Sequence, residues 1–196
     1  LLDDPGRLGS AIAALVTADD ERTAMACRAA ALVDGRGALR VALAIAGELG
    51  GPGEDLTLRL AGPDDEAWLL DLQSRPQTRR YARNPAAPDP AEHAAWLKVT
   101  LDAPDRILMI AMRRGEAVGM ARLDLDAAER RAEVSLAVLP EQQGKGVGAG
   151  ILRALRTTAP GLALEATVLP GNERSAALFA SAGYVRTRHT PWRRIP

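Results

Sequence analysis

The stretch AEVSLAVLPEQQGKGVGAG, residues 132–150, leads from an apolar, strand-like run through a glycine-rich loop into the start of a helix. Glycine has no Cβ atom, so the loop can turn tightly and a ligand can approach its backbone closely. The helix start favours an anion, because its free amides and the helix dipole place about half a positive charge there. The stretch therefore predicts either a phosphate-binding loop or merely a tight turn from strand to helix.

Two common phosphate-binding motifs do not fit this loop. Gly144, Gly146 and Ala149 have the spacing of a dinucleotide-binding motif. However, LPEQQ separates the strand from Gly144, and the 46 residues after Gly150 are too few for the further strand–helix units of that fold. A P-loop is excluded because Lys145 is not followed by Ser or Thr.

The composition indicates a globular chain without a net electrostatic bias. The 196 residues contain 25 basic and 25 acidic side chains, so neither nucleic acid nor an anionic membrane surface is expected as a partner. One cysteine, Cys27, and two histidines without ligand spacing predict no disulfide and no metal site. No apolar run approaches the roughly 20 residues that span a bilayer. The acidic start lacks the basic region of a signal peptide, so we expect a cytoplasmic chain. The absence of an initiator Met indicates processing or a piece of a longer protein.

The chain is expected to have three parts. Residues 1–48 are rich in alanine and predict a helical appendage, residues 49–55 a glycine-proline linker, and residues 56–196 the main domain. Hydrophobic periodicity and the positions of capping residues, glycines and prolines predict helices at 21–33, 37–49, 64–75, 91–103, 149–159 and 172–183. They predict strands at 56–61, 132–139, 162–169 and 184–192, and two strands around a glycine turn within 106–126.

The pattern that fits the loop is Q/R-x-x-G-x-G/A, met by Gln143, Gly146 and Gly148 between a strand and a helix. Together with NERSAALFASAGY, residues 172–184, it resembles the GNAT family of acetyl-CoA-dependent N-acetyltransferases. The resemblance extends from about residue 56 to residue 192. It implies an α/β (α+β) fold, with a mixed, mostly antiparallel central sheet flanked by helices, and acetyl-CoA as the cofactor.

The same resemblance implies a cofactor site. The strand before the loop would offer its backbone to the pantetheine arm, the loop amides would hold the pyrophosphate, and the Asn-led helix would lie beside the arm. The residues concerned are Leu136, Ala137, Val138, Gln143, Gly144, Lys145, Gly146, Val147, Gly148, Asn172 and Phe179.

Acetyl transfer to an amine requires a neutral nucleophile and a donor to the developing oxyanion. The amide of Val138 is the candidate donor. Glu133 is the candidate base, and Ser135, which shares its side of the strand, could orient a water molecule. Alternatively, Glu133 is an exposed acid paired with Arg131 or Arg122.

The Asn-led helix departs from the family pattern at one position. The usual general acid there is a tyrosine, but this chain has Phe179, which has no hydroxyl group. Tyr184 occupies the place of the structural aromatic after Gly183, so its expected role is core packing. The sequence therefore identifies no general acid, and the thiolate leaves unprotonated or takes its proton from water.

EHAAWLKVTL (92–101), GMARLDLD (119–126) and the opening stretch resemble the GNAT branch that acetylates nucleotide-linked amino sugars in pseudaminic-acid-type pathways. His93 and Trp96 match its H-x-x-W-L helix, although such a pair can also serve packing. Residues 1–48 resemble the C-terminal end of the nucleotide-sugar hydrolase to which such enzymes are sometimes fused. The two resemblances imply a nucleotide-linked amino sugar as the acceptor.

Two groups of arginines could contact the phosphates of such an acceptor. Alternatively, each is a solvated surface. The first group, which includes the substrate candidates Arg79 and Arg80, is Arg75, Arg79, Arg80 and Arg83, and the second is Arg186, Arg188, Arg193 and Arg194.

The main hypothesis is thus an N-acetyltransferase that acts on the amino group of a nucleotide-activated sugar, as a possible homodimer. A second hypothesis retains the chemistry but takes a protein N-terminus, a ribosomal protein or another small amine as the acceptor. A third hypothesis is a domain that binds acyl-CoA without turnover. It is retained because Phe179 replaces the family tyrosine.

Overall fold

The computed structural model describes residues 13, 16–32, 56–126, 128–159, 161–186 and 191–194. The chain divides into two compact units, Leu1–Leu39 and Arg40–Pro196. The first contains helix α2 (Asp19–Leu32), which begins with three acidic residues, where negative charge suits the helix dipole. The predicted helix 37–49 and the predicted linker 49–55 lie outside the described residues.

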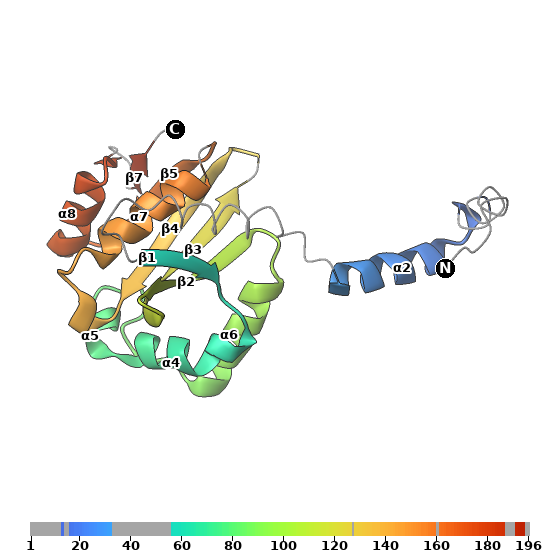
Figure 1. Cartoon of the computed structure of the whole chain (residues 1–196), viewed down its shortest axis with the longest axis horizontal. Helices are drawn as coiled ribbons and strands as arrows, with labels where there is room; N and C mark the ends of the chain where they lie inside the picture. The colour runs from blue at the N-terminus through green and yellow to red at the C-terminus, as the bar shows by residue number, and fades with distance from the viewer. Residues whose placement is uncertain are drawn as a thin grey trace. The chain divides into compact units, whose positions relative to one another are not determined.

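The second unit is built on a seven-stranded sheet in the order β1-β2-β3-β4-β5-β7-β6 (Figure 1). Neighbouring strands are antiparallel, except that β4 and β5 are parallel. The predicted mixed, mostly antiparallel sheet is therefore confirmed. The strands are β1 (Leu56–Leu60), β2 (Arg106–Arg113), β3 (Glu116–Asp126), β4 (Arg131–Val138), β5 (Ala163–Thr167), β6 (Val185–Arg186) and β7 (Pro191–Arg194).

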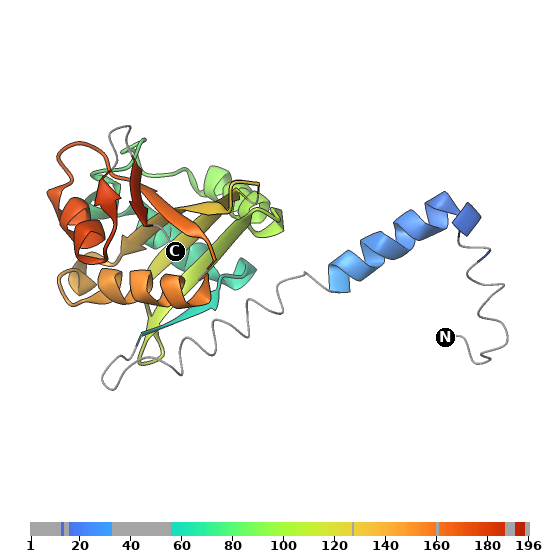
Figure 2. The same ribbon diagram turned by 90° about the horizontal axis from the view of Figure 1, so that it is seen from above.

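Helices cover both faces of this sheet. α4 and α6 lie on one face and α7 on the other (Figure 1), and in Figure 2 α7 lies in front of the sheet. Among the described residues, no helix is long and apolar enough to cross a membrane. The helices are η2 (Pro63–Asp65), α4 (Glu66–Ser74), α5 (Pro76–Arg79), α6 (Pro90–Asp102), η3 (Pro140–Gln142), α7 (Val147–Thr158) and α8 (Glu173–Ser181).

Successive residues of β3 show how the two faces are filled. Met120 packs into a buried cluster with Leu69 of α4 and Leu97 of α6. On the other face, Gly119 leaves room for α7, because a Cβ atom there would lie 3.4 Å from the side chain of Ile151 and 2.8 Å from the carbonyl oxygen of Ala137. This glycine lets the sheet and α7 approach closely.

The turn between β2 and β3 has the predicted glycine. Arg114 and Gly115 both have positive φ angles, 52° and 82°. A two-residue turn with both φ angles positive matches the right-handed twist of a hairpin. The predicted pair of strands around a glycine turn is confirmed.

The prediction of a single last strand over 184–192 is wrong. The structure has two short strands, β6 and β7, which pair with each other in antiparallel register, so the chain reverses between them. β7 begins at Pro191 and pairs with β5, and a proline is tolerated at the first position of a strand. Helix α5 was not predicted; it begins at Pro76, whose fixed φ suits a first helical turn.

Asp65 connects the edge strand β1 to the helical layer. Its side chain is 12% exposed. The carboxylate accepts hydrogen bonds from both terminal nitrogens of Arg59, at 2.8 and 2.6 Å, and from the amide of Gly62 at 2.8 Å. The hydrogen bonds from Arg59, helped by that from Gly62, hold the pKa of Asp65 below its usual 3.8, although burial opposes this shift. The charged carboxylate thus stabilises the junction of β1 and α4.

We predict that Asp65→Asn lowers the free energy of unfolding by about 1.5–3 kcal/mol at neutral pH, because charge-assisted hydrogen bonds are lost. The folded pKa lies below the unfolded value of 3.8, so this stabilisation is present above pH 3.8 and disappears as the pH falls through the folded pKa. In urea unfolding, the difference between wild type and variant should therefore shrink in acid. Asp64→Asn, at an exposed position of the same turn, should have no such effect, and equal losses would contradict this role of Asp65.

Candidate active site

The site begins where β4 and β5 separate. β4 pairs with β3 along its whole length, up to Val138 opposite Gly119. It pairs with β5 at three positions only, Arg131 to Glu133. Beyond Glu133, a cavity of about 1520 Å³ opens between the two strands, lined by residues 134–138 of β4 and by residues 167–169 at the end of β5. Backbone amides and carbonyls are strong hydrogen-bonding groups, so the open edge of β4 suits a ligand with amide groups of its own.

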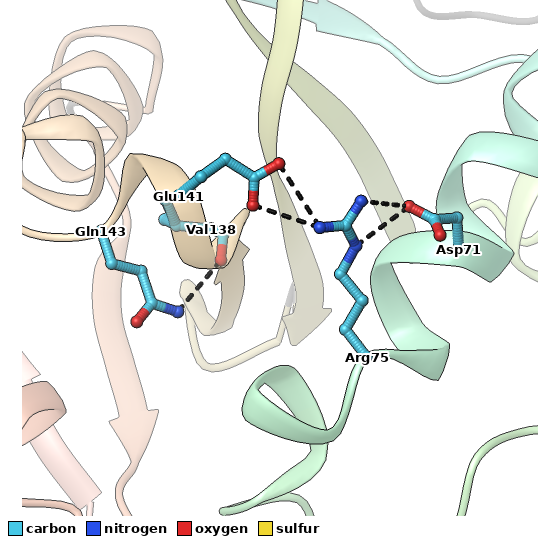
Figure 3. Close-up of polar contacts among 5 residues, drawn as sticks. All are labelled: Asp71, Arg75, Val138, Glu141 and Gln143. Carbon is cyan, nitrogen blue, oxygen red and sulfur yellow. Dashed lines mark hydrogen bonds and ion pairs between the residues drawn. The ribbon is translucent and has the colours of Figure 1, made fainter.

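The predicted residues Leu136, Ala137 and Val138 all lie at this edge and line the cavity. The carbonyl of Val138 accepts a hydrogen bond from Nε2 of Gln143 at 3.2 Å (Figure 3). Oε1 of the same glutamine accepts a hydrogen bond from Nη1 of Arg174, in α8, at 2.6 Å. Gln143 therefore links the end of β4 to α8. Arg174 is not among the residues predicted from the sequence, although it is a cation in the first turn of the Asn-led helix.

An ion-pair bridge holds the other side of the loop. Nη1 of Arg75 lies 3.1 Å from a carboxylate oxygen of Glu141 in η3, and its Nη2 lies 2.8 Å from Asp71 of α4 (Figure 3). The guanidinium of Arg75 is thus committed to protein carboxylates, and Arg75 does not line the cavity. Arg75 is therefore neither a phosphate contact nor a simply solvated side chain. It is a structural bridge between α4 and η3.

The loop presents free amides to the cavity. Gly144 and Gly146 have left-handed φ angles of 77° and 79°. The amides of Gln143 and Lys145 donate to carbonyls within the loop, at 3.3 and 3.4 Å. Within the described part of the chain, five amides at the start of α7 have no protein acceptor, namely those of Gly144, Gly146, Val147, Gly148 and Ala149.

These amides fit a phosphate group. A Cβ atom built on Gly146 would have no atom within 4 Å, so the space in front of the backbone is open. The loop also precedes a 12-residue helix, whose dipole adds to the attraction for an anion. Loop and strand edge face the same cavity, as a long cofactor with a diphosphate and an amide-containing arm requires.

Helix α8 forms a third wall. Asn172 caps this helix, since its side-chain oxygen accepts a hydrogen bond from the amide of Ser175 at 3.1 Å. Asn172 and Phe179 both line the cavity. Phe179 is 5% exposed and packs edge-to-face on Tyr184, with ring centroids 5.0 Å apart. Tyr184 is therefore a buried packing residue, as expected, and position 179 offers the cavity no hydroxyl group.

Glu133 and Ser135 also line the cavity, from the same side of β4. Glu133 lies in register with Asp124 of β3 and Glu165 of β5, so three carboxylates cross the sheet in a row. The cation near Glu133 is Arg83, whose Nη2 lies 3.7 Å from a carboxylate oxygen. At that distance in an exposed setting the attraction is weak.

The alternative in which Glu133 pairs with Arg122 or Arg131 is wrong. Arg122 pairs with Asp124 at 2.7 Å and Arg131 pairs with Asp126 at 2.9 Å. Asp124 follows Arg122 on the same side of β3, and Asp126 is the register partner of Arg131, so these acids lie closer to the two arginines than Glu133 does.

The substrate candidates Arg79 and Arg80 line the cavity beyond the end of β4. The terminal nitrogens of Arg79 donate to the side chain of Gln73 and the carbonyl of Asn84. The guanidinium of Arg80 lies 5.3 Å from the ring centroid of Tyr81. Among the described residues, the cavity lining contains five arginines and three glutamates, namely Arg79, Arg80, Arg83, Arg122, Arg174, Glu92, Glu133 and Glu173.

Of the second arginine group, Arg186 does not line this cavity. Arg186 is exposed in β6, and Arg193 and Arg194 lie in β7. Arg188 lies outside the described residues.

His93 and Trp96 of α6 line the cavity together, with ring centroids 5.2 Å apart. His93 is 5% exposed. Burial lowers its pKa below 6.5, and the carboxylate of Glu66 in α4 opposes the shift only in part. The imidazole is therefore neutral at pH 7. Among the described residues, no cluster of three or more His, Cys, Asp or Glu side chains could hold a metal ion.

Solved structures share this architecture. The spermidine N-acetyltransferase of Vibrio cholerae, solved with CoA and spermine, is 21% identical over 72% of this chain and 94% of its own, with a TM-score of 0.64. An acetyltransferase from Thermus thermophilus is 23% identical over 71% and 96%, with a TM-score of 0.63. The aminoglycoside acetyltransferase AAC(6')-Ib, solved with paromomycin and acetyl-CoA, is 23% identical over 71% and 90%, with a TM-score of 0.62. At these identities the likeness supports the fold.

No curated protein sequence matches the chain significantly. The family described as "Acetyltransferase (GNAT) domain" matches residues 55–185. This range includes the sheet from β1 to the start of β6, the glycine loop and the cavity. The chain therefore belongs to the GNAT acetyltransferase family.

Proposed function

We propose that this GNAT N-acetyltransferase transfers the acetyl group of acetyl-CoA to the amino group of a nucleotide-linked sugar. The observation that carries the choice of acceptor is the charge of the cavity, where five arginines accompany three glutamates. Spermine and paromomycin, the compounds in two similar structures, are polycations. A cavity with an excess of arginines disfavours a polycation and favours an acceptor that carries phosphates.

Two further points support this acceptor. The helix with His93 and Trp96, which resembles the amino-sugar branch of the family, lines the same cavity as the arginines. In addition, Arg80 and Arg83 make no short ion pair among the described residues, since the contact of Arg83 with Glu133 is 3.7 Å long. Their guanidinium groups are available to a diphosphate.

The geometry of the cavity supports a proposed role for each of the cofactor residues. Leu136 to Val138 offer the open strand edge to the pantetheine arm, and the amides of Gly144, Gly146, Val147 and Gly148 hold the pyrophosphate. Acetyl-CoA supplies the thioester whose carbonyl carbon is attacked. The amide of Val138 is the proposed donor to the thioester oxygen, which becomes negative as the amine adds.

Glu133 is the proposed base. An amine attacks only as the neutral species, so a proton must leave the acceptor ammonium, directly to the carboxylate or through water held by Ser135. Both side chains lie in the cavity on one side of β4. Because position 179 is Phe, the leaving thiolate takes its proton from water.

We predict that Gly146→Ala weakens acetyl-CoA binding roughly tenfold or more, because the added methyl group occupies the space in front of the phosphate-binding amides. Gly115→Ala is the matched control. Its φ is also left-handed, its Cβ would likewise meet no atom within 4 Å, and it lies in the β2–β3 turn, outside the cavity. Both variants should lose about 1 kcal/mol of stability from backbone strain. Calorimetry should show a raised Kd for Gly146→Ala alone; a Kd equal to that of Gly115→Ala would refute this site.

We predict that the wild-type protein acetylates a uridine diphosphate-linked amino sugar with a higher kcat/KM than spermine, an aminoglycoside or a peptide N-terminus. Arg80→Ala and Arg83→Ala should each raise KM for the nucleotide sugar roughly tenfold, because a charge-assisted hydrogen bond is lost. Neither should affect acetylation of the free amino sugar, which has no phosphate.

Lys98→Ala removes an exposed cation paired with Asp102 outside the cavity. It should change KM neither for the nucleotide sugar nor for the free amino sugar. If one of the other three amines is acetylated faster than the nucleotide sugar, the proposed acceptor is wrong.

We predict that Glu133→Gln lowers kcat/KM for the acceptor roughly 100-fold, since general base help is lost, and leaves the Kd of acetyl-CoA unchanged. Glu165→Gln is the control, because Glu165 lies beside Glu133 in the same row of carboxylates but does not line the cavity. Steady-state kinetics with free-thiol detection separates the two variants. Similar rates for both would remove Glu133 from the chemistry.

A further inference from the structure

His93 interrupts the apolar side of α6. The inward positions of this helix are His93, Leu97 and Thr100, all at most 5% exposed. Among the described residues, neither ring nitrogen of His93 has a hydrogen-bond partner. A buried polar group without a partner destabilises the fold, and an apolar side chain of similar shape would pack there without that penalty. Packing alone therefore does not account for a histidine at this position.

Thr100 shows what distinguishes His93. The hydroxyl group of Thr100 is also buried and without a partner, on the same side of the same helix. However, Thr100 does not line the cavity, whereas His93 and the half-buried Trp96 do. The combination of an unpaired imidazole and a neighbouring indole in the cavity wall points to a ligand.

We infer that His93 binds a hydroxyl group on the sugar ring of the acceptor, while Trp96 packs against the apolar face of that ring. The inference rests on the proposed function, because it takes the acceptor to be a nucleotide-linked sugar. It adds the part of the site that recognises the sugar, as distinct from the arginines that hold the phosphates. His93 is thus a specificity-determining residue for a hydroxylated acceptor.

The chemistry of a neutral imidazole fits a hydroxyl group. One ring nitrogen donates and the other accepts, and a hydroxyl group can do both. Phosphates are better served by the arginines of the same cavity, and an ammonium group by Glu133 or Glu92. The neutral state of His93 follows from its burial among apolar side chains, with Glu66 as the opposing charge.

Access requires only a local movement. Both ring nitrogens are shielded from solvent in the unliganded structure, although the ring lies in the cavity wall. Rotation about the Cβ–Cγ bond changes the direction of both ring nitrogens, and this torsion has a broad energy minimum. Trp96 is held in place by the core cluster, against which it packs.

The test compares kcat/KM of His93→Phe and of the wild type for a uridine diphosphate-linked amino sugar and for a series of its deoxy analogues. Each analogue lacks one ring hydroxyl group, and the series covers every ring position. The wild type should prefer the hydroxylated acceptor over one of the deoxy analogues by roughly tenfold or more in kcat/KM. His93→Phe should lose that preference because its KM for the hydroxylated acceptor is raised. His93→Gln, which keeps a donor and an acceptor, should restore part of it. The Kd of acetyl-CoA should stay unchanged in all variants.

Thr100→Val is the matched control, since it also removes an unpaired buried polar atom from α6 but outside the cavity. Thr100→Val should leave kcat/KM unchanged for the hydroxylated acceptor and for the deoxy analogue. His93→Phe should keep or raise Tm, because a residue retained for binding is not optimal for stability.

A lowered Tm with an unchanged preference between the acceptors would overturn the inference and make His93 a packing residue, while the proposed function would stand. If the wild type acetylates polyamines and no amino sugar, the proposed function and this inference fall together.

Discussion

The separation of β4 from β5 is the constraint on which the whole site depends. The two strands are parallel and pair at only three positions. A parallel pair needs a crossover connection, and here the crossover consists of η3, the glycine loop and α7. The connection leaves β4 at the place where its edge is no longer covered by β5. The open strand edge and the N-terminus of α7 therefore face one cavity, and both present backbone hydrogen-bonding groups that the sheet does not use.

The loop keeps its shape through contacts with distant parts of the chain. Left-handed glycines set the course of the backbone, while Gln143 links β4 to Arg174 of α8 and Arg75 links α4 to Glu141. Exposed ion pairs such as those of Arg75 contribute little to stability. The effect of the Gln143 and Arg75 contacts is geometric, because they hold three separate elements around the free amides of the loop. A loop that is already in its binding conformation loses less entropy when the ligand arrives.

The lining of the cavity combines charged and neutral side chains. Arginines from α5 and the segment after it supply charge, whereas α6 contributes a neutral imidazole and an indole. On the opposite wall, Phe179 packs on Tyr184 and provides apolar surface where a relative with tyrosine would provide a proton donor. In the proposed mechanism, the chemistry therefore depends on β4 and on water more than on α8. The acceptor proposed above, with both phosphates and a hydroxylated ring, would use all parts of such a lining.

The sequence by itself determined the order and type of most helices and strands. Hydrophobic periodicity, glycines and prolines set the backbone conformation of the few residues around them, so these signals can be read locally. It identified the hairpin turn at Gly115, the loop from Gln143 to Gly148 and the replacement at Phe179. Only the tertiary structure decided which distant groups meet. Arg122 and Arg131 pair with Asp124 and Asp126 because of the β3–β4 register. The last strand divides into β6 and β7 because β7 has to pair with β5. Likewise, the unpaired state of His93 results from packing between α6, the sheet and the cavity, which no local pattern encodes.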